Sequence, residues 1–159
     1  MFKVGIIGAG HIAEKMATTL HGMEGVEAYA VAARQMEKAQ DFASRRGFTK
    51  AYGSYEALAD DQDVDLIYVA TPHSLHYSHV KMCLEKGRPV LCEKAFMANA
   101  REAADVIRLS EEKGVFLAEA IWTRYLPFRQ TVRRLIDGGA IGRTSLLTAH
   151  LGYPVTHKE

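Results

Sequence analysis

The sequence predicts an α/β fold in which helices cover both faces of a mainly parallel sheet. Short apolar runs alternate with stretches of helical periodicity, a pattern typical of βαβ units. The run Leu66–Ala70 is continuous and apolar, as expected of a strand that is buried on both faces. A glycine-rich turn at residues 8–10 lies directly between a strand-like and a helix-like segment. Right-handed crossovers between such units give a doubly wound sheet.

The first half of the chain divides at turn residues and glycines. Val4–Ile7 is a compact apolar strand that ends at Gly8, and the next apolar residues recur at helical spacing. Gly47 stands at a position typical of the end of a helix. In chain order the predicted elements are strand Val4–Ile7, helix His11–Leu20, strand Val26–Ala32, helix Met36–Arg46, a short strand near Ala51 and Tyr52, and a short helix Ser54–Ala59.

The following elements keep the same rhythm. The predicted elements are strand Leu66–Ala70, a helix that carries Val80, Cys83 and Leu84 inward and stops at Gly87, strand Val90–Cys92, a helix capped by Asn99, and strand Val115–Ala118. Glu102 stands three residues after Asn99, which predicts an asparagine form of the capping box. We expect the inner face of that helix to consist of Ala100, Ala103, Ala104 and Ile107.

The rhythm changes after Ala118. Pro127–Asp137 is a predicted helix with Phe128, Val132, Leu135 and Ile136 on one face, and Thr144–Leu151 is a predicted strand with no visible partner. We therefore expect a dinucleotide-binding domain over residues 1–120 and, over residues 121–159, a connecting helix and the first strand of a truncated second α+β domain. Unpaired backbone and exposed apolar side chains favour association, so we expect a homo-oligomer.

Composition excludes several classes of protein. Lys and Arg number 20 against 19 Asp and Glu, so no basic excess is present to neutralise nucleic acid. Cys83 and Cys92 are too few for a disulfide framework and form no metal-ligand cluster. No apolar run is long enough to span a bilayer. Met1-Phe2-Lys3 leads directly into a strand-like segment, so we expect no signal peptide and a cytoplasmic protein.

The turn Gly8-Ala9-Gly10-His11-Ile12-Ala13 fits the dinucleotide-binding pattern G-x-G-x-x-G/A. Gly8 permits the tight turn, Gly10 lets the backbone approach a pyrophosphate, and Ala13 keeps helix and strand close. The free N–H groups where the helix begins, at His11 and Ile12, then face the anion. A glycine-rich turn can also serve only as a connection, but its place at the start of a βαβ chain favours a Rossmann dinucleotide site.

The end of the second strand indicates which dinucleotide is bound. An NAD-preferring site has an acidic residue there, which accepts a hydrogen bond from the ribose 2′-hydroxyl. This chain has Ala32-Ala33-Arg34-Gln35 instead. Arg34 is able to bind a 2′-phosphate in bidentate fashion, and Lys38 adds a second positive charge one turn later. The alternative is that both are ordinary solvated surface cations. We predict NADP(H) as the cofactor, in preference to NAD(H).

Two further segments follow strands, where ligands bind in such sheets: residues 71–76 and residues 92–95. Together with the glycine turn they give the chain a resemblance to the N-terminal part of the glucose–fructose oxidoreductase/inositol dehydrogenase (Gfo/Idh/MocA) family. That family carries Glu-Lys-Pro after the strand that ends here at Cys92, and Ala95 replaces its proline. The stretch 119–127 is similar to the dihydrodiol dehydrogenase and NADP-dependent sugar dehydrogenase branch. The resembling stretches are 4–10, 33–34, 37–39, 71–76, 90–94 and 119–127.

The resemblance implies an oxidoreductase that transfers a hydride between a nicotinamide and a sugar, polyol or trans-diol. It implies that Lys94 exchanges the proton of the reacting hydroxyl, a role that needs an ammonium pKa lowered toward neutrality. By the same resemblance Glu93 holds the nicotinamide-ribose side. Thr71, Pro72 and His76 line the nicotinamide pocket, and Trp122 and Arg124 close over the cofactor.

Each of these residues also has a simpler interpretation. Glu93 and Lys94 can form a loop ion pair of little energetic value. His76 can be a partly buried helix residue, and a single tryptophan is often plain core or interface. Family members carry a second domain that supplies most of the substrate pocket, which leaves three hypotheses: the cofactor-binding half of an NADP-dependent oxidoreductase, a non-catalytic nucleotide-binding module or partner subunit, and a structural role with an empty pocket.

Overall fold

The computed structural model describes residues 1–150 and 152. Its centre is a six-stranded sheet in the order β3-β2-β1-β4-β5-β6. Every neighbouring pair is parallel, which confirms the doubly wound fold class. The strands are β1 (Phe2–Ile7), β2 (Val26–Ala32), β3 (Lys50–Tyr52), β4 (Leu66–Val69), β5 (Val90–Cys92) and β6 (Leu117–Glu119).

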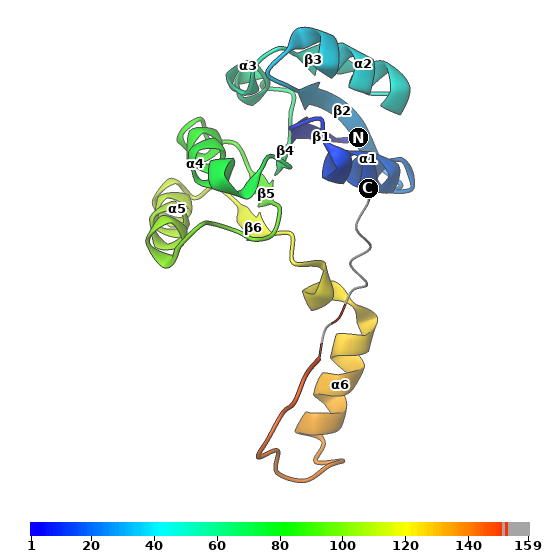
Figure 1. Cartoon of the computed structure of the whole chain (residues 1–159), viewed down its shortest axis with the longest axis vertical. Coiled ribbons are helices and arrows are strands. Elements are labelled where there is room, and N and C mark those ends of the chain that lie inside the picture. The colour runs from blue at the N-terminus through cyan, green and yellow to red at the C-terminus, as the bar shows by residue number, and fades with distance from the viewer. Residues whose placement is uncertain (151, 153–159) are drawn as a thin grey trace. The chain divides into compact units, whose positions relative to one another are not determined.

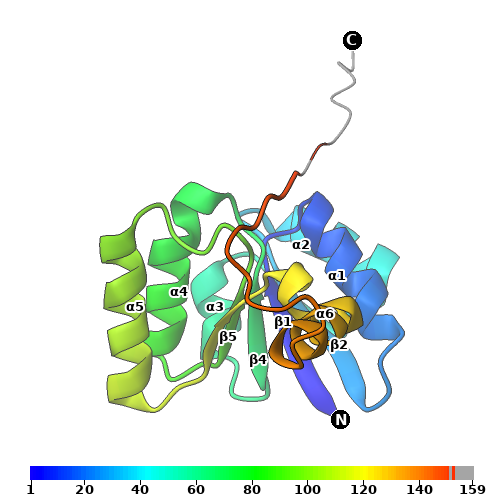
Figure 2. The same ribbon diagram turned by 90° about the horizontal axis from the view of Figure 1, so that it is seen from below.

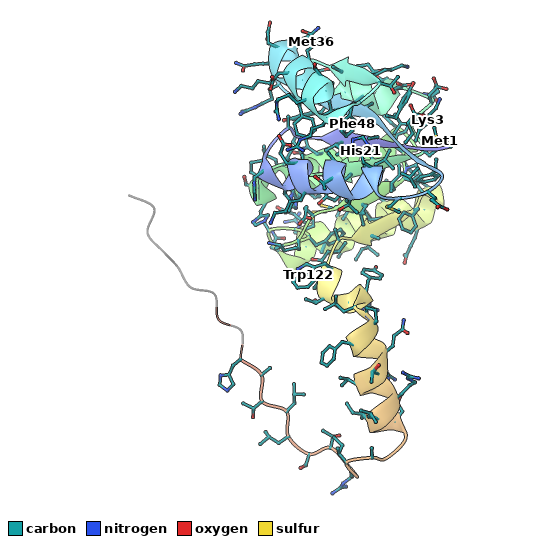
Figure 3. The ribbon with its side chains drawn as sticks, turned by 90° about the vertical axis from the view of Figure 1, so that its right-hand side faces the viewer. Met1, Lys3, His21, Met36, Phe48 and Trp122 are labelled. Carbon is teal, nitrogen blue, oxygen red and sulfur yellow. The ribbon has the colours of Figure 1, made fainter. Side chains whose placement is uncertain are left out.

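Helices cover the sheet from both sides (Figure 1), and in Figure 2 the strands run up the picture between the two helix layers. Helices α1 and α2 lie on one face, whereas α3, α4 and α5 lie on the other. Their bounds are α1 (His11–His21), α2 (Met36–Arg46), α3 (Tyr55–Asp60), α4 (His76–Glu85) and α5 (Ala100–Lys113), and a short 3-10 helix, η1 (His73–Leu75), precedes α4. His21, at the end of α1, lies beside the end of α2, where its Nε2 is 2.6 Å from the Arg46 carbonyl oxygen (Figure 3).

Strand β4 is buried on both faces, as its continuous apolar sequence predicts. Ile67 and Val69 belong to the core cluster beneath α3, α4 and α5, whereas Tyr68 belongs to the cluster beneath α1 and α2. Successive side chains of a strand point to opposite faces, so an apolar residue at every position is what a doubly covered strand requires. The central strands are thereby fixed in register, and their ends are held at a common edge.

Helix α5 begins and helix α2 ends at the capping residues predicted for them, and Ser54 provides a further cap. The Asn99 side chain accepts a hydrogen bond from the Glu102 N–H at 3.0 Å, and the Glu102 carboxylate accepts one from the Ala98 N–H at 3.3 Å. Ser54 caps α3 in the same manner, accepting from the Ala57 N–H at 3.2 Å. Gly47 ends α2 in the left-handed conformation, at φ 64°, which glycine adopts without steric penalty.

The predicted inner face of α5 is wrong at three of its four residues, Ala103 being the exception. Ile107 is 46% exposed, Ala100 and Ala104 are exposed as well, and the residue that enters the core is Val106. The rotational position of the helix is decided by Val106, flanked by the half-buried Ala103 and Leu109. Alanine is small enough to occur on either face of a helix, so a row of alanines does not predict which face is buried.

The chain divides into two compact units, Met1–Ile121 and Trp122–Glu159. In the second, a 3-10 helix, η2 (Trp122–Tyr125), is followed by α6 (Pro127–Asp137). The predicted strand Thr144–Leu151 is wrong over the residues that the structure describes: residues 144–150 form no strand, and Leu151 lies outside the description. A strand requires a neighbour for its N–H and C=O groups, and these residues pair with no other described segment.

No helix among the described residues is long and apolar enough to cross a membrane. Cys83 and Cys92 are both buried free thiols. Burial raises the pKa of each thiol to about 12, so both are protonated core side chains at neutral pH. Within residues 1–150 and 152, no group of three His, Cys, Asp or Glu side chains is placed to hold a metal ion.

Candidate dinucleotide site

Because the strands are parallel, their carboxyl ends lie along one edge of the sheet. The segments that follow β1, β2, β4 and β5 therefore form a continuous rim, with Glu119 at the end of β6 completing it. The predicted site residues of the first unit all lie on this rim or in the first turn of the helix that follows it. They are Gly8, Gly10, His11, Ile12, Arg34, Lys38, Thr71, Pro72, His76, Glu93 and Lys94.

The glycine turn leaves β1 with a conformation that requires glycine. Gly8 has φ 103°, and a Cβ atom there would lie 3.0 Å from the Ala70 carbonyl oxygen and 3.3 Å from Thr71 Cγ2. Gly10 is the N-cap of α1 and has no side-chain cap, and nothing lies within 4 Å of the place a Cβ would occupy. The first N–H groups of α1 are therefore open to an anion, in the arrangement that binds a pyrophosphate.

Beside this turn lies a cavity of about 490 Å³, lined by Ala9, Ala33, Arg34, Gln35, Lys38 and Tyr55. Arg34 and Lys38 are exposed, and neither forms an ion pair within the described part of the chain. No carboxylate lines this cavity. It therefore offers two cations to a negatively charged group.

Tyr55 is a site residue that sequence reasoning missed. It is the first residue of α3, and its position places the ring in the wall of the cavity that holds Arg34 and Lys38. Each of the other four tyrosines of residues 1–121 donates its hydroxyl to a carboxylate; they are Tyr29, Tyr52, Tyr68 and Tyr77. The Tyr55 hydroxyl has no such acceptor among the described residues. The only signal in the sequence was its place next to the capping Ser54.

The loop after β5 is held by contacts on both sides. The Tyr68 hydroxyl donates to the Glu93 carboxylate, which also accepts from the Lys94 N–H at 3.0 Å. Burial, together with this bond to a carboxylate, raises the pKa of Tyr68, so the hydroxyl stays a donor. On the other side, Glu119 accepts from the Phe96 N–H at 3.1 Å. The backbone of the loop is thereby fixed from β4 and from β6.

Lys94 lies in this fixed loop with its side chain exposed. Its ammonium forms no ion pair with Glu93 or with any other described residue. The peptide bond between Lys94 and Ala95 is cis. The arrangement thus leaves an unpaired ammonium at the rim, on a backbone that neighbouring side chains hold in place.

His76 is fully buried and joins two loops of the rim. Its Nδ1 lies 2.9 Å from the Ala95 carbonyl oxygen and its Nε2 lies 2.9 Å from that of Thr71. Both ring nitrogens therefore face backbone, and the side chain ties the loop after β4 to the loop after β5. Thr71 is 6% exposed, whereas Pro72 is exposed. Contact of His76 with a cofactor stays a prediction.

Trp122 and Arg124 belong to the second unit, in η2. Trp122 is 58% exposed and is labelled where that unit begins in Figure 3. Their predicted role over a cofactor stays a prediction.

The fold and the rim together define a Rossmann domain with a glycine turn at the start of α1 and a cationic cavity at the end of β2. A family model described as an oxidoreductase family with an NAD-binding Rossmann fold, GFO_IDH_MocA, matches residues 2–120. The chain belongs to this family, which confirms the resemblance drawn from its motifs.

Curated relatives include trans-1,2-dihydrobenzene-1,2-diol dehydrogenases. The mouse enzyme is 40% identical over 155 residues, which are 96% of this chain and 46% of the mouse protein. The Xenopus tropicalis enzyme is 39% identical, and the matched residues are 47% of its length. The chain therefore spans a little under half the length of these relatives.

Solved structures of similar fold include KijD10, a 3-ketoreductase from Actinomadura kijaniata in complex with NADP. It superposes with a TM-score of 0.80 at 30% identity, over 89% of this chain and 45% of that chain. An NAD-binding oxidoreductase from Klebsiella pneumoniae gives a TM-score of 0.78 at 26% identity, over 89% of this chain and 40% of the other.

Proposed function

We propose that this chain is the cofactor-binding part of an NADP(H)-dependent oxidoreductase that acts on a sugar, polyol or trans-diol by hydride transfer. Residues 1–120 would form the dinucleotide-binding domain, and residues 121–159 the start of a second domain. The observation that carries the proposal is the cavity at the end of β2, in which Arg34 and Lys38 stand without a carboxylate.

The chemistry of this cavity fits a 2′-phosphate. A dianion on the adenosine ribose would be bound by the planar guanidinium of Arg34 and by the Lys38 ammonium. The Tyr55 hydroxyl, which belongs to the lining of the same cavity, would donate a third hydrogen bond. A free ribose 2′-hydroxyl, as in NAD(H), would find no carboxylate acceptor here. The pyrophosphate would lie on the N–H groups of α1, beside Gly8 and Gly10.

Lys94 would act on the proton of the reacting hydroxyl group. When bound, a nicotinamide supplies the acceptor or donor of the hydride. The Lys94 amine would take the hydroxyl proton as the alcohol is oxidised and return it in the reverse reaction. Glu93, held by Tyr68 and by the Lys94 N–H, would fix the backbone on which this side chain stands.

The names of relatives support the substrate class. Those at about 40% identity are dehydrogenases of a trans-diol, and KijD10 is a ketoreductase crystallised with NADP. Both reactions interconvert a CH–OH group and a carbonyl group. We therefore propose a vicinal diol or a sugar hydroxyl as the substrate of the whole protein.

The cofactor assignment is tested by titrating the chain with NADPH and with NADH and following nucleotide fluorescence. We expect tighter binding of NADPH, and we expect Arg34→Ala to lower NADPH affinity by about tenfold or more with little effect on NADH. Arg101→Ala, an exposed arginine of α5 outside this cavity, is the matched control and should change neither affinity. Equal affinity of the unmodified chain for the two nucleotides would contradict the assignment.

A second candidate is a nucleotide-binding module without catalysis. The observation that favours it is the exposure of Lys94, because a catalytic lysine is usually activated by burial. A steady-state assay across sugars and trans-diols separates the two. Turnover that Lys94→Ala abolishes, with NADPH affinity retained, would exclude the module.

We also propose that the chain forms a homo-oligomer through α6. Phe128 is 71% exposed and Leu135 54% exposed, so an apolar face of this helix lies open among the described residues. Light scattering should give a mass above that of one chain, and Phe128→Glu should reduce it to one. The cytoplasmic location remains a prediction.

A further inference from the structure

The His79 side chain stands between two parts of the candidate site that are far apart in sequence. It projects from α4, is half-buried, and contacts Tyr55 at the start of α3 on one side and Thr71 after β4 on the other. Neither its type nor its spacing singled it out in the sequence.

Toward α3, the His79 ring meets the Tyr55 ring in an edge-on arrangement, with ring centroids 4.7 Å apart and an interplanar angle of 69°. Such T-shaped contacts are attractive and directional. Tyr55 lines the cavity of Arg34 and Lys38, so the imidazole backs the wall of the proposed adenosine 2′-phosphate site.

Toward β4, a hydrogen bond of 2.9 Å joins His79 Nδ1 and Thr71 Oγ1. Thr71 is buried at the end of β4 and abuts the glycine turn, where a Cβ on Gly8 would lie 3.3 Å from Thr71 Cγ2. The same imidazole therefore fixes the rotamer of a side chain that borders the proposed pyrophosphate site.

The electrostatic surroundings keep this ring uncharged. Burial lowers the pKa of His79, the neighbouring His76 lowers it further, and the Glu56 carboxylate of α3 raises it. The lowered pKa leaves His79 neutral at neutral pH, so it works through packing and a hydrogen bond rather than through charge.

We propose that His79 is a positioning residue that couples the two halves of the dinucleotide site, holding Tyr55 against the adenosine end and Thr71 against the pyrophosphate end. The inference rests on the proposed function, because it assumes that these two ends hold one NADP(H). It assigns His79 no contact with the nucleotide.

The experiment uses the full chain and two probes, NADPH and adenosine 2′-phosphate, which carries only the adenosine end. His79→Phe keeps a ring against Tyr55 and removes the bond to Thr71. We expect it to weaken NADPH binding about fivefold and to leave adenosine 2′-phosphate within about twofold of the unmodified chain. His79→Gln keeps a hydrogen-bonding group for Thr71 and removes the ring. It should weaken adenosine 2′-phosphate about threefold and restore part of the NADPH affinity lost in His79→Ala.

Thr71→Val removes the same hydrogen bond from the other partner. Combined with His79→Phe, it should cost no more NADPH affinity than the larger single effect, because both changes break one bond. His21→Gln, a histidine on the opposite face of the sheet, is the matched control. Thermal unfolding of each variant shows whether it is folded.

Equal loss of both probes in His79→Phe and His79→Gln, or additive effects of Thr71→Val and His79→Phe, would overturn the positioning role and leave the proposed function intact. Failure of the unmodified chain to bind either probe would overturn the proposed function and this inference with it.

Discussion

The two units of the chain differ in what their apolar side chains meet. In residues 1–121 the apolar stripes of helices α1 to α5 lie against a sheet, and Ile6, Ile67 and Val90 are fully buried. In the second unit, Phe128, Leu135 and Ile141 are between 54% and 71% exposed. Both units contain amphipathic helices, so local sequence pattern does not separate them.

The comparison teaches that a helix of clear periodicity still needs a partner layer to contribute tertiary stability. The sheet supplies that layer in the first unit, and it also places the candidate site at its rim. The described residues of the second unit contain no sheet, and the predicted site residues it carries, Trp122 and Arg124, lie in a short 3-10 helix. Matched substitutions in the two units test this contrast.

The largest difference in stability between the two units should appear when one apolar side chain is truncated in each. Ile67→Ala should lower the free energy of unfolding by about 3–4 kcal/mol, because it leaves a cavity in the centre of β4. Leu135→Ala, on the exposed face of α6, should change it by less than about 0.5 kcal/mol at concentrations where light scattering gives the mass of one chain. Urea unfolding followed by circular dichroism measures both. Similar losses in the two variants at those concentrations would mean that α6 is packed within the single chain.

The next effect concerns acid stability. Burial raises the pKa of the Asp61 carboxyl, but hydrogen bonds from the Tyr52 hydroxyl, the Asp63 N–H and Lys50 outweigh it and lower the pKa to about 2. The ionised Asp61 carboxylate therefore stabilises the folded chain. This stabilisation is present above the unfolded pKa of 3.8 and is lost as pH falls toward 2.

Asp61→Asn should therefore cost about 1–2 kcal/mol at pH 7 and progressively less between about pH 4 and pH 2. In the second unit, Asp137 and Arg133 form an exposed ion pair with side chains 57% and 69% exposed. Asp137→Asn should leave the acid unfolding profile unchanged. If the stability of Asp61→Asn parallels that of the unmodified chain at all pH values, the lowered pKa of Asp61 is contradicted.

A smaller effect should follow from removing one hydroxyl at the cavity. Tyr55→Phe should weaken NADPH binding about threefold, the value of a single hydrogen bond, and leave NADH unchanged. Tyr52→Phe removes a nearby hydroxyl whose acceptor is Asp61, and it should change stability without changing NADPH affinity. If both variants bind NADPH as the unmodified chain does, Tyr55 makes no contact with the phosphate.

The smallest effect on affinity should be at Trp122, which tests whether the second unit takes part in the site. Trp122 is the single tryptophan of the chain, so its emission reports on this one position. If it closes over the cofactor, saturating NADPH should quench this emission, and Trp122→Phe should change NADPH affinity by about twofold or less. Unaltered tryptophan emission at saturation would confine the nucleotide site to the first unit.

Much of the fold could be predicted because its signals are local. The continuous apolar run at β4, the capping Asn99 and the left-handed Gly47 each depend on neighbours a few residues away. The glycine turn, together with Arg34 and the lack of an acid after β2, likewise predicts the cofactor end of the site from a few adjacent residues. Patterns of a few adjacent residues therefore predict both the backbone conformation of the turns and the positive charge after β2.

What could not be predicted depends on contacts across the sheet. Tyr55 and His79 carry no motif, and their side chains meet only because α3 and α4 lie side by side behind the rim. His76 was predicted from its motif, but its full burial against two carbonyl groups is a tertiary fact. The orientation of α5 and the absence of a strand over residues 144–150 were missed for the same reason.

The sequence by itself determined the order of strands and helices, the glycine turn after β1 and the charge at the end of β2, because each depends on a few adjacent residues. Only the tertiary structure decided which side chains meet at the rim, since parallel strands bring together segments that are tens of residues apart. It also decided which apolar faces are covered, because burial depends on a partner layer that no single segment contains.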